Sequence, residues 1–495
     1  MKKLILLFAG FVFSMGIFAY TPSPVNFHKY RINHKRTTLP NRYDSRDLGI
    51  IFPARNQGHT GTCWAFTACE VMRTLYHKNN LECDSLAPIV YVNCAKNLGY
   101  TNVTLDSGGN ENIISTMNAR LITPVNQSSV PVITTWNYEC PSYEEKDIHG
   151  YVLGTELLPE NDHIAIKEAI MKYGSVFSSM KYDKLYYNEH TYFYEYKGQG
   201  PSDHAVNIIG WDDTKRIWIV KNTWGTTDFG EKGVFWVSYD DSNISNRVIV
   251  FNQNVDKQDI DNVYGYSNTG ATQCFGFDPK YPSRILIKYD IKEGESIEYI
   301  STFILNPNTK LQILVRAVDK QKTILYDSDE FNVEYVGMHL HKLKQPVVSN
   351  GDSLQVEICY TSDYECAIPI ESQTNYNNIT LYGNQKFFNG VDWIPVGEDQ
   401  ERKFNFVVYV YTKEGATDIE ETESNKEGSL LIGGEIDPNV WDYAIRANIF
   451  DISGRNYGTI KPGDRIPDLN VGYYVLVVDK KDGGFIVEKF NVFSN

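Results

Sequence analysis

The segment that decides the fold is Gln57-Gly58-His59-Thr60-Gly61-Thr62-Cys63-Trp64-Ala65-Phe66, in which glycine and threonine give way to apolar residues. Beyond the cysteine, apolar side chains recur at the spacing of one helical stripe, at Trp64, Ala68, Val71, Met72 and Leu75. This pattern predicts an amphipathic helix that begins at Cys63. Unpaired backbone N–H groups and the helix dipole favour a thiolate there, so we expect a lowered thiol pKa and a nucleophile at Cys63.

A base and an orienting group occur further along the chain, in two β-prone runs at 202–211 and 217–225. The turn-like residues 212–215 separate the runs, which predicts a β-hairpin. An unbulged register centred on that turn places His204 opposite Asn222, with Cβ atoms about 5 Å apart, and a bulge would shift it by one residue. The Asn222 amide would then hold the His204 imidazole in one tautomer.

Together these motifs resemble the papain family of cysteine peptidases, over roughly 42–250. The resemblance implies an α+β fold with a helical lobe and a β-barrel-like lobe. It implies that Cys63 is the nucleophile, that His204 is the base and acid, and that Asn222 orients His204. The oxyanion hole would consist of the Gln57 side-chain amide and the Cys63 backbone N–H. The substrate-binding residues that we infer from the resemblance are Ser107, Gly108, Gly109, Glu111, Asp203 and Trp224.

The chain departs from the family pattern at several positions. Thr60 stands where family members usually carry a cysteine, so no disulfide is expected beside the nucleophile. Glu111 has two interpretations: it reaches the substrate pocket and favours basic or polar side chains there, or it is a solvated loop acid. No long inhibitory helical segment precedes Asn41. Control by export itself, or by the basic stretch His28 to Leu39 lying in the cleft, is the remaining hypothesis.

The reaction that the resemblance implies is attack of the thiolate on a peptide carbonyl, followed by hydrolysis of a thioester. Two alternatives belong to other classes of protein. In the first, a surface adhesin or glycan-binding protein uses the peptidase fold as a scaffold. In the second, a thiol transpeptidase delivers the acyl group to an amine. The intact set of Gln57, Cys63, His204 and Asn222 favours the enzyme over the scaffold.

The N-terminus has the features of a secretory signal, with Lys2-Lys3 followed by an apolar run to Phe18 that ends near Ala19. We therefore expect a signal peptide at 1–19 and a short leader at 20–41. The net charge of −15 argues against nucleic acid and anionic membranes as partners, because both reward clustered Lys and Arg. The prediction is a secreted, periplasmic or cell-surface protein without a transmembrane segment or a cofactor, acting on proteins or peptides.

Eight cysteines in an exported chain invite disulfides. The resemblance implies a structural pair of Cys94 with Cys140, and Cys359 with Cys366 is expected to form a local clip. Cys69, Cys83 and Cys274 have no obvious mates. No cysteine spacing suggests zinc, so we expect no metal site.

Composition predicts further domains after the peptidase unit at 42–252. From 253 to 412 the chain is a series of short β-prone runs split by turn residues, which predicts an all-β sandwich. The segments 367–372 and 383–388, with Asp392-Trp393, resemble the lectin-like domain attached to bacterial papain-type peptidases. Exposed aromatic side chains would stack on a cell-surface glycan, although aromatics in such sandwiches are more often core.

The remaining residues divide into an acidic linker at 413–428 and a last module at 429–495. The order of motifs in that module resembles the C-terminal sorting domain of proteins exported by the type IX route of Bacteroidetes-type bacteria. An unrelated Ig-like spacer is the alternative. Either interpretation predicts a small Ig-like β-sandwich.

Overall fold

The computed structural model divides the chain into two compact units, Met1–Thr417 and Asp418–Asn495. In the first unit it describes residues 20–21, 23, 29–34, 38–130, 139–227, 229–279, 281–318 and 323–415. In the second unit it describes 431–432, 435–436, 438–451, 456–467, 469, 472–481 and 485–492. The predicted signal peptide and most of the predicted linker lie outside the described residues.

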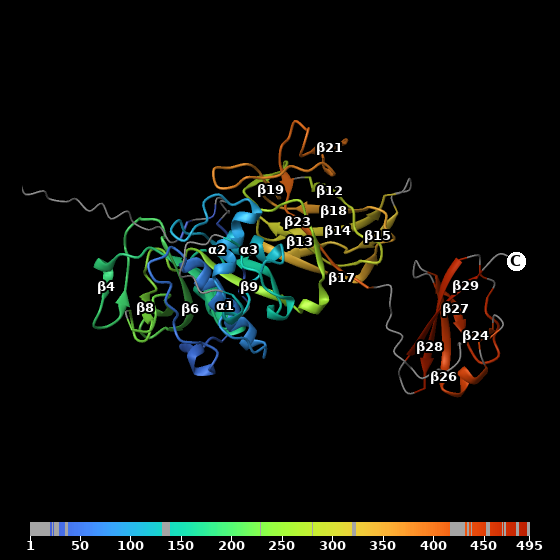
Figure 1. Cartoon of the computed structure of the whole chain (residues 1–495), viewed down its shortest axis with the longest axis horizontal. Coiled ribbons are helices and arrows are strands. Elements are labelled where there is room, and N and C mark those ends of the chain that lie inside the picture. The colour runs from blue at the N-terminus through green and yellow to red at the C-terminus, as the bar shows by residue number, and fades with distance from the viewer. Residues whose placement is uncertain are drawn as a thin grey trace, which may run out of the picture. The chain divides into compact units, whose positions relative to one another are not determined.

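The helices of the first unit gather around one buried helix (Figure 1). They are α1 (Cys63–Lys78), α2 (Ile89–Cys94), α3 (Glu111–Ala119) and α4 (His163–Tyr173). Helix α1 begins at Cys63, as the apolar stripe predicts. It is not amphipathic, however, because it packs against strands on one side and α3 on another, which buries even the polar side chains of Thr67 and Glu70.

One mixed sheet completes the domain that contains these helices, in the order β2-β9-β3-β6-β7-β8-β5-β4 with β1 paired to β6. Its strands are β1 (Arg42–Asp44), β2 (Tyr151–Leu157), β3 (Val176–Met180), β4 (Tyr187–Asn188), β5 (Phe193–Tyr194), β6 (His204–Asp212), β7 (Ile217–Lys221), β8 (Val234–Ser238) and β9 (Val248–Val255). Every residue of β6 is buried. The strand that starts at His204 therefore runs through the core, and His204 is held at its N-terminal end.

The predicted hairpin forms between β6 and β7, but its predicted register is wrong. Asp212 pairs with Ile217 at the turn and Asn207 pairs with Lys221 at the far end, with a bulge between Ile208 and Gly210. The turn closes later than expected because the Asp212 carboxylate accepts the N–H groups of the residues that follow it. Extending this register places Asn222 opposite Val206, two residues from His204. A shift of two keeps both side chains on one face of the sheet.

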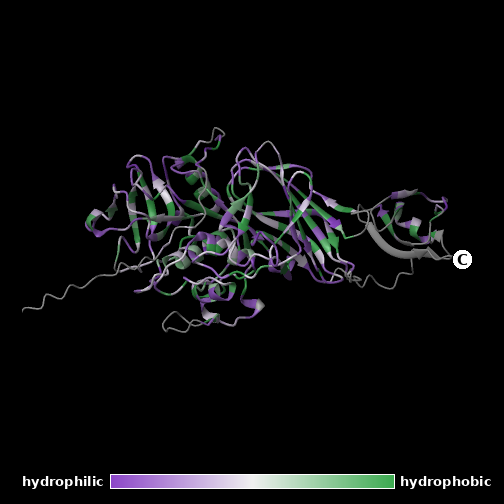
Figure 2. Cartoon of the chain, turned by 90° about the horizontal axis from the view of Figure 1, so that it is seen from above, coloured by the Kyte–Doolittle hydropathy of each residue, from purple (hydrophilic) through white to green (hydrophobic). Residues whose placement is uncertain are grey.

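A β-sandwich follows in the same unit, as the turn-punctuated runs predict. One sheet has the order β10-β23-β13-β17, a second β15-β14-β18-β12-β20-β21 with β16 on β14, and a third β11-β19-β22. The strands are β10 (Asn262–Tyr264), β11 (Gln273–Phe275), β12 (Ser283–Tyr289), β13 (Ser296–Ile304), β14 (Thr309–Ala317), β15 (Ile324–Asp327), β16 (Phe331–Val333), β17 (Gly337–Val348), β18 (Leu354–Thr361), β19 (Ile368–Glu371), β20 (Gln385–Phe388), β21 (Trp393–Val396), β22 (Asn405–Phe406) and β23 (Val408–Lys413). Figure 2 shows hydrophobic and hydrophilic residues alternating along these strands, and β12 buries every second residue.

The β-sandwich packs directly on the domain that contains α1 to α4. Leu157 at the end of β2 donates its backbone N–H to Val336 at 2.8 Å, and Tyr411 of β23 donates its hydroxyl to Ala119 at 3.0 Å. A Cβ on Gly337 would lie 2.0 Å from the Thr155 carbonyl oxygen, so only glycine permits this approach. One hydrophobic core contains residues of both domains, which fixes the sandwich beside the helices that line the cleft.

The described part of the second unit is all β apart from one short helix. It contains β24 (Leu431–Ile432) paired with β25 (Glu435–Ile436), and a sheet β27-β26-β28-β29. These four strands are β26 (Ala444–Asp451), β27 (Asn456–Ile460), β28 (Gly472–Lys480) and β29 (Phe485–Val492). Short 3-10 helices in the chain are η1 (Ser45–Leu48), η2 (Ala95–Leu98), η3 (Gln127–Ser129), η4 (Glu145–Asp147), η5 (Lys184–Tyr186), η6 (Lys257–Asp259) and η7 (Pro438–Asp442). Among the described residues, no helix is both long and apolar enough to cross a membrane.

Candidate active site

The Cys63 thiol lies between the start of α1 and the start of β6. The backbone N–H of Ala205, the residue after His204, donates to Cys63 Sγ at 3.3 Å. Cys63 has no exposed surface and His204 is 3% exposed. The structure thus brings the predicted nucleophile and the predicted base to adjacent positions, although 141 residues of sequence separate them.

The His204 ring is held on two sides. Its Nε2 atom is 2.8 Å from the Asn222 Oδ1 atom, so Nε2 carries the hydrogen if the amide oxygen accepts. The Trp224 ring stacks on the imidazole at 4.5 Å with an interplanar angle of 25°. Tyr182, which the sequence does not single out, meets Trp224 edge-on at 4.7 Å. These contacts leave Nδ1 as the ring nitrogen that is free to exchange a proton.

Gln57 is fixed beside the thiol by the loop that precedes α1. Its backbone N–H donates to the Thr223 carbonyl at 2.9 Å, and its Oε1 accepts the Thr223 hydroxyl at 2.5 Å. Its Nε2 donates to the Thr60 carbonyl at 2.6 Å. An amide nitrogen carries two hydrogens, and this bond uses one of them. Thr60, which replaces the usual cysteine, hydrogen-bonds within this loop through its hydroxyl.

The expected lowering of the thiol pKa does not occur in this form of the molecule. Burial raises the pKa of Cys63 to about 12, and the hydrogen bonds from Ala205 and Trp64 offset only part of that rise. Burial also lowers the pKa of His204 to about 4, against the hydrogen bond to Asn222. Both groups are therefore neutral near pH 7, because water is excluded from them more effectively than the helix terminus can compensate.

The cleft is closed by the leader of the same chain. The Tyr20 N–H donates to the Asp203 carbonyl at 3.1 Å, and the Thr21 N–H donates to the Gly109 carbonyl at 3.1 Å. Tyr20 pairs with Gly109 in a parallel bridge and is 1% exposed. These two predicted substrate-binding residues, Asp203 and Gly109, thus bind a polypeptide segment through their backbones.

The Tyr20 side chain fills a pocket whose far wall carries a buried ion pair. Its hydroxyl donates to Glu111 Oε2 at 2.7 Å, and Arg247 contacts Glu111 Oε1 at 2.5 Å. Glu111 is 5% exposed, so the interpretation of a solvated loop acid is wrong. Phe177 lies against the phenol ring, with ring centroids 6.3 Å apart. Tyr20 and Arg247 carry no local sequence signal that separates them from other tyrosines and arginines.

The other predicted substrate-binding residues support the wall of the cleft. Ser107 bonds the 102–104 loop through its hydroxyl, to Thr104 N at 2.9 Å and to the Asn102 carbonyl. Gly108 follows with φ of 74°. A Cβ on Gly109 would lie 2.5 Å from the Trp64 ring, so the wall can approach α1 only with glycine there. The Asp203 carboxylate pairs with Lys181 and accepts the Tyr182 N–H at 2.8 Å, while its backbone carbonyl accepts the Tyr20 N–H.

The hypothesis that the His28 to Leu39 stretch lies in the cleft is wrong for its described residues. Lys29 pairs with Glu160 at 2.6 Å, and His34 Nε2 lies 2.7 Å from Asp162 at the start of α4. Acidic side chains outside the cleft attract this basic stretch, and the cleft itself is occupied by the preceding residues 20–21.

The structure contains the expected disulfide between Cys94 and Cys140. The expected clip between Cys359 and Cys366 is wrong, because Cys366 pairs with Cys274. Cys274 on β11 faces the β19 segment next to Cys366, whereas Cys359 lies on β18 in a different sheet. The cysteines that form no disulfide are Cys63, Cys69, Cys83 and Cys359. Among the described residues, no three His, Cys, Asp or Glu side chains gather as metal ligands would.

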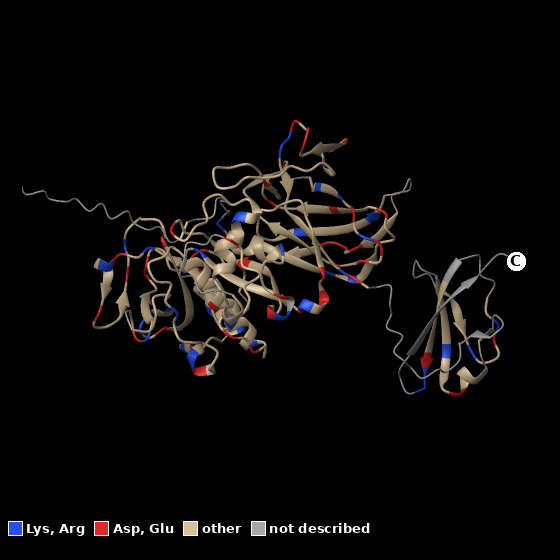
Figure 3. Ribbon diagram, in the orientation of Figure 1, with Lys and Arg blue, Asp and Glu red and all other residues tan. Residues whose placement is uncertain are grey.

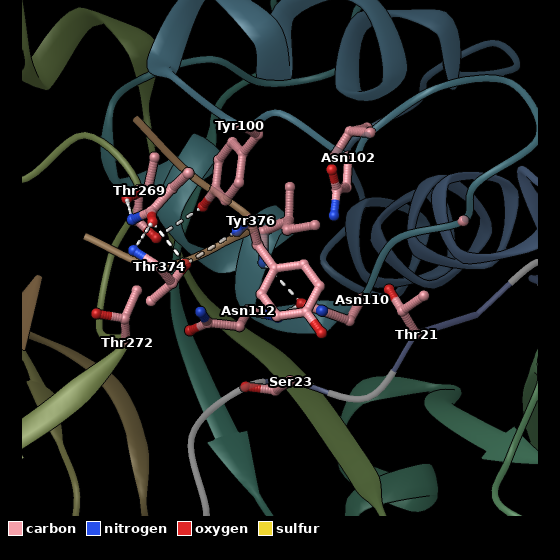
Figure 4. A pocket seen from close by; sticks show the side chains of 14 residues that line it. Thr21, Ser23, Tyr100, Asn102, Asn110, Asn112, Thr269, Thr272, Thr374 and Tyr376 are labelled. Atoms are coloured by element: carbon pink, nitrogen blue, oxygen red, sulfur yellow. Dashed lines mark hydrogen bonds between the residues drawn. The ribbon is translucent and has the colours of Figure 1, made fainter. Parts of the chain in front are cut away.

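A cavity of about 400 Å³ continues the cleft from Gly108 to the β-sandwich (Figure 4). We call it the seam pocket. Its lining residues are all uncharged and come from the leader, the helical lobe and the sandwich, among them Ser23, Asn110, Asn112, Thr272, Thr374 and Tyr376. Figure 4 shows Tyr376 and Asn112 beside the space through which Thr21 and Ser23 pass. Elsewhere Lys and Arg are interspersed with Asp and Glu along the described ribbon (Figure 3).

Comparisons with known proteins agree with this architecture. Residues 39–251 match the family model described as papain family cysteine protease. Cathepsin K of Mus musculus is 24% identical over 205 residues, which are 39% of this chain and 58% of that protein. Thiol protease aleurain of Arabidopsis thaliana is 29% identical over 214 residues, covering 41% and 57%. The chain thus spans somewhat less than two thirds of these curated relatives.

The solved structure of the cysteine protease and lectin-like domains of Cwp84, a surface layer associated protein of Clostridium difficile, superposes with a TM-score of 0.66. The sequence identity is 17%, and the alignment covers 79% of this chain and 91% of that one. The chain therefore carries a papain-family domain, in residues 39–251, and its β-sandwich shares the fold of a lectin-like domain. The predicted papain-family domain and the predicted β-rich fold of the residues that follow it are thus confirmed.

Proposed function

We propose that this chain is an exported cysteine endopeptidase, in which Cys63 is the nucleophile, His204 the general base and acid, and Asn222 the residue that orients His204. The observation that carries the proposal is the hydrogen bond of 2.8 Å between His204 and Asn222 beneath Trp224, beside a cysteine at a helix start. A cysteine, an imidazole and an orienting group within reach of one another are the components of an acyl-transfer site.

The reaction would require the leader to leave the cleft first. With Tyr20 in place both Cys63 and His204 are buried and neutral. Displacement of the leader by substrate admits water and lets the thiol transfer its proton to Nδ1 of His204. The thiolate then attacks the peptide carbonyl, while the Cys63 N–H and the second N–H of Gln57 bind the oxyanion. His204 next protonates the leaving amine and activates the water that hydrolyses the thioester.

The direct test compares wild-type protein with Cys63→Ala and Cys83→Ala on casein and with an epoxide that labels papain-type thiols. Cys83 is a matched control, because it is also a buried cysteine that forms no disulfide. We expect Cys63→Ala to lose both hydrolysis and labelling, and Cys83→Ala to keep both. Casein hydrolysis by Cys63→Ala at the wild-type rate would contradict the proposal. Reaction in the presence of an added amine separates hydrolysis from transpeptidation, since a transpeptidase gives mainly the aminolysis product.

Export and surface location are the second part of the proposal. The sequence features of 1–19 support removal of a signal peptide after Ala19, and those of 429–495 support a sorting role for the last module. N-terminal sequencing of the exported protein should begin at Tyr20. Deletion of 418–495, a separate compact unit, should leave the peptidase active but no longer at the cell surface. Normal surface display of the truncated chain would contradict the sorting role.

A further inference from the structure

We infer that the pocket filled by Tyr20 selects a tyrosine side chain in substrates, and that Arg247 is the residue that makes this selection possible. This inference rests on the proposed peptidase function and names its substrate class. Tyr20 lies beside Gly109, where the backbone of a bound chain pairs with the cleft wall. A substrate residue that pairs with Gly109 would direct its side chain into the same pocket.

The chemistry of the pocket is that of a carboxylate with one acceptor position unused. Arg247 contacts Oε1 of Glu111 through both Nε and a terminal nitrogen at 2.5 Å, which leaves Oε2 for a donor. The Tyr20 hydroxyl supplies that donor at 2.7 Å. Burial, followed by the charge of Glu111, holds the pKa of Tyr20 well above its usual value, so the phenol remains a neutral donor.

The ion pair also determines what the pocket rejects. Glu111 alone would attract Lys or Arg side chains, as one interpretation of the sequence supposes. Its charge is balanced by Arg247, whose own charge would repel a second cation. The phenol ring is enclosed by apolar neighbours such as Phe177, and Phe303 and Gly337 of the β-sandwich enclose the far side of the ion pair. An aromatic ring with a hydroxyl at its far end therefore fits better than a basic, acidic or aliphatic side chain.

The matched pair of tyrosine and phenylalanine substrates isolates this effect, because they differ by one hydroxyl. Phenylalanine in the pocket would leave a buried carboxylate oxygen without a donor. We expect kcat/KM to be about tenfold to a hundredfold higher for tyrosine than for phenylalanine at the residue that pairs with Gly109, from the usual cost of an unpaired buried acceptor.

The experiment measures both peptides with wild-type protein, Glu111→Leu, Arg247→Met and, as a control, Glu357→Leu. Glu357 is an equally buried carboxylate paired with Arg284 and Arg316 in the β-sandwich, away from the cleft. Glu111→Leu should bring the ratio of kcat/KM for the tyrosine peptide to kcat/KM for the phenylalanine peptide to within about threefold of one, because no acceptor remains. Glu357→Leu should lower thermal stability and keep the preference. Arg247→Met leaves the Glu111 charge unbalanced. The kcat/KM of a peptide with lysine at the residue that pairs with Gly109 should therefore rise relative to that of the tyrosine peptide.

The outcomes separate this inference from the peptidase proposal. Cleavage of both peptides with equal efficiency by wild-type protein overturns the tyrosine pocket and leaves the peptidase intact. Absence of cleavage of either peptide, together with absence of epoxide labelling, overturns the peptidase. A tyrosine preference that survives Glu111→Leu overturns the role of the ion pair. As an internal check, Tyr20→Ala should raise activity on the tyrosine peptide, because substrate no longer displaces a side chain from the pocket.

A second observation concerns the seam pocket. We propose that it binds the part of a polypeptide substrate that lies beyond the tyrosine pocket, so that the β-sandwich forms one wall of the substrate cleft. Thr21 hydrogen-bonds the wall at Gly109 and lines this cavity, and Ser23 lines it two residues later. A chain bound at Gly109 thus passes directly into it.

The lining indicates what the seam pocket accepts. Asn112 is 5% exposed, and among the described residues its Oδ1 finds no donor although its Nδ2 donates to the Ala271 carbonyl at 3.2 Å. Tyr376, on the sandwich, leaves 57% of its surface exposed at the cavity. An unpaired acceptor, an exposed aromatic ring and no charge suit backbone N–H groups and uncharged side chains of a peptide.

Binding to the Cys63→Ala protein tests this without turnover. Calorimetry compares a four-residue tyrosine peptide with a ten-residue peptide. The longer peptide is extended by serine and threonine on the side of the tyrosine away from the cleaved bond. Tyr376→Ala should weaken binding of the long peptide about tenfold and leave the short one unchanged. The control Tyr281→Ala removes another exposed tyrosine of the sandwich, 69% exposed, and should change neither. Equal binding of the long peptide by all three proteins overturns the proposal. So does a result in which Tyr376→Ala abolishes binding of a neutral oligosaccharide and leaves the long peptide unaffected, which would assign the pocket to a glycan.

Discussion

The buried ion pair between Glu70 of α1 and Lys221 of β7 provides a quantitative test of how the site is held. Their charged atoms are 2.5 Å apart, and the two side chains are 5% and 4% exposed. The pair joins the helix that begins at Cys63 to the strand that leads into Asn222. We therefore expect the substitution Lys221→Met to affect both stability and the geometry of the site.

The expected magnitude follows from the charge that the substitution leaves behind. Removing one partner of a buried pair typically costs about 3–5 kcal/mol, because the remaining charge is desolvated and uncompensated. Arg55 lies 3.9 Å from the other carboxylate oxygen of Glu70 and would compensate part of the loss, which favours the lower end, about 3 kcal/mol. Replacing both partners, in Glu70→Leu/Lys221→Met, removes the stranded charge and should restore stability to within about 1 kcal/mol of wild type.

Urea unfolding followed by tryptophan fluorescence measures this, since Trp64, Trp211 and Trp218 are buried in the same domain. The rate of epoxide labelling of Cys63 reports the effect on the site. Unfolding of Lys221→Met within about 1 kcal/mol of wild type would show that no uncompensated charge remains, and a double variant as unstable as the sum of its single variants would show that the two residues do not act as a pair.

Three further outcomes follow from the structure. The pKa values of His204 and His339 are lowered to about 4 by burial. Between pH 6.5 and about 4 the unfolded chain therefore binds protons at these histidines that the folded chain does not bind. Stability should be full above pH 6.5 and fall by about 3 kcal/mol for each of these two histidines as pH drops to 4, and His339→Gln should make the fall in melting temperature smaller. Gly109→Ala should lower the rate of labelling at least about tenfold by pushing the wall from Trp64, whereas Gly383→Ala, where a Cβ meets nothing within 4 Å, should not. Cys274→Ser should cost about 2–5 kcal/mol by opening the disulfide to Cys366, and the free Cys359→Ser should cost less than about 1 kcal/mol, both measured by urea unfolding.

Local patterns predict those parts of the site that depend on a single element. The apolar stripe after Cys63 places the thiol at the first residue of α1, and the hairpin pattern places His204 and Asn222 on neighbouring strands. The register of that hairpin is predicted wrongly, since the Asp212 carboxylate accepts backbone N–H groups in the turn and a bulge lies between Ile208 and Gly210. The error is harmless to the site because a shift of two residues keeps a side chain on its face of the sheet.

Predictions from the sequence are wrong where the chemistry of a residue depends on a partner far away in the sequence. From the sequence alone, Glu111 is a carboxylate that would attract cations. In the structure its charge is balanced by Arg247, 136 residues away. Cys366 has a near neighbour in sequence at Cys359 and yet pairs with Cys274, 92 residues away, because strand pairing brings β11 beside the β19 segment. No periodicity within either segment carries this information, since the partners meet only through the tertiary fold.

The thiol of Cys63 depends both on its local position in the sequence and on residues far away in the sequence. Its position at a helix start favours the thiolate, by an effect of about 1 kcal/mol that is confined to the first turn. Its pKa is nevertheless raised to about 12 by burial, and Tyr20 and Thr21 lie along the same cleft, hydrogen-bonded to Asp203 and Gly109. Desolvation of a buried charge exceeds the helix dipole by several-fold, so burial rather than the helix start sets the protonation of Cys63. In Tyr20→Ala, where water re-enters the cleft, the thiol should therefore react with the epoxide faster than in the wild-type protein at pH 7. An unchanged rate would mean that the helix start alone sets the reactivity of Cys63.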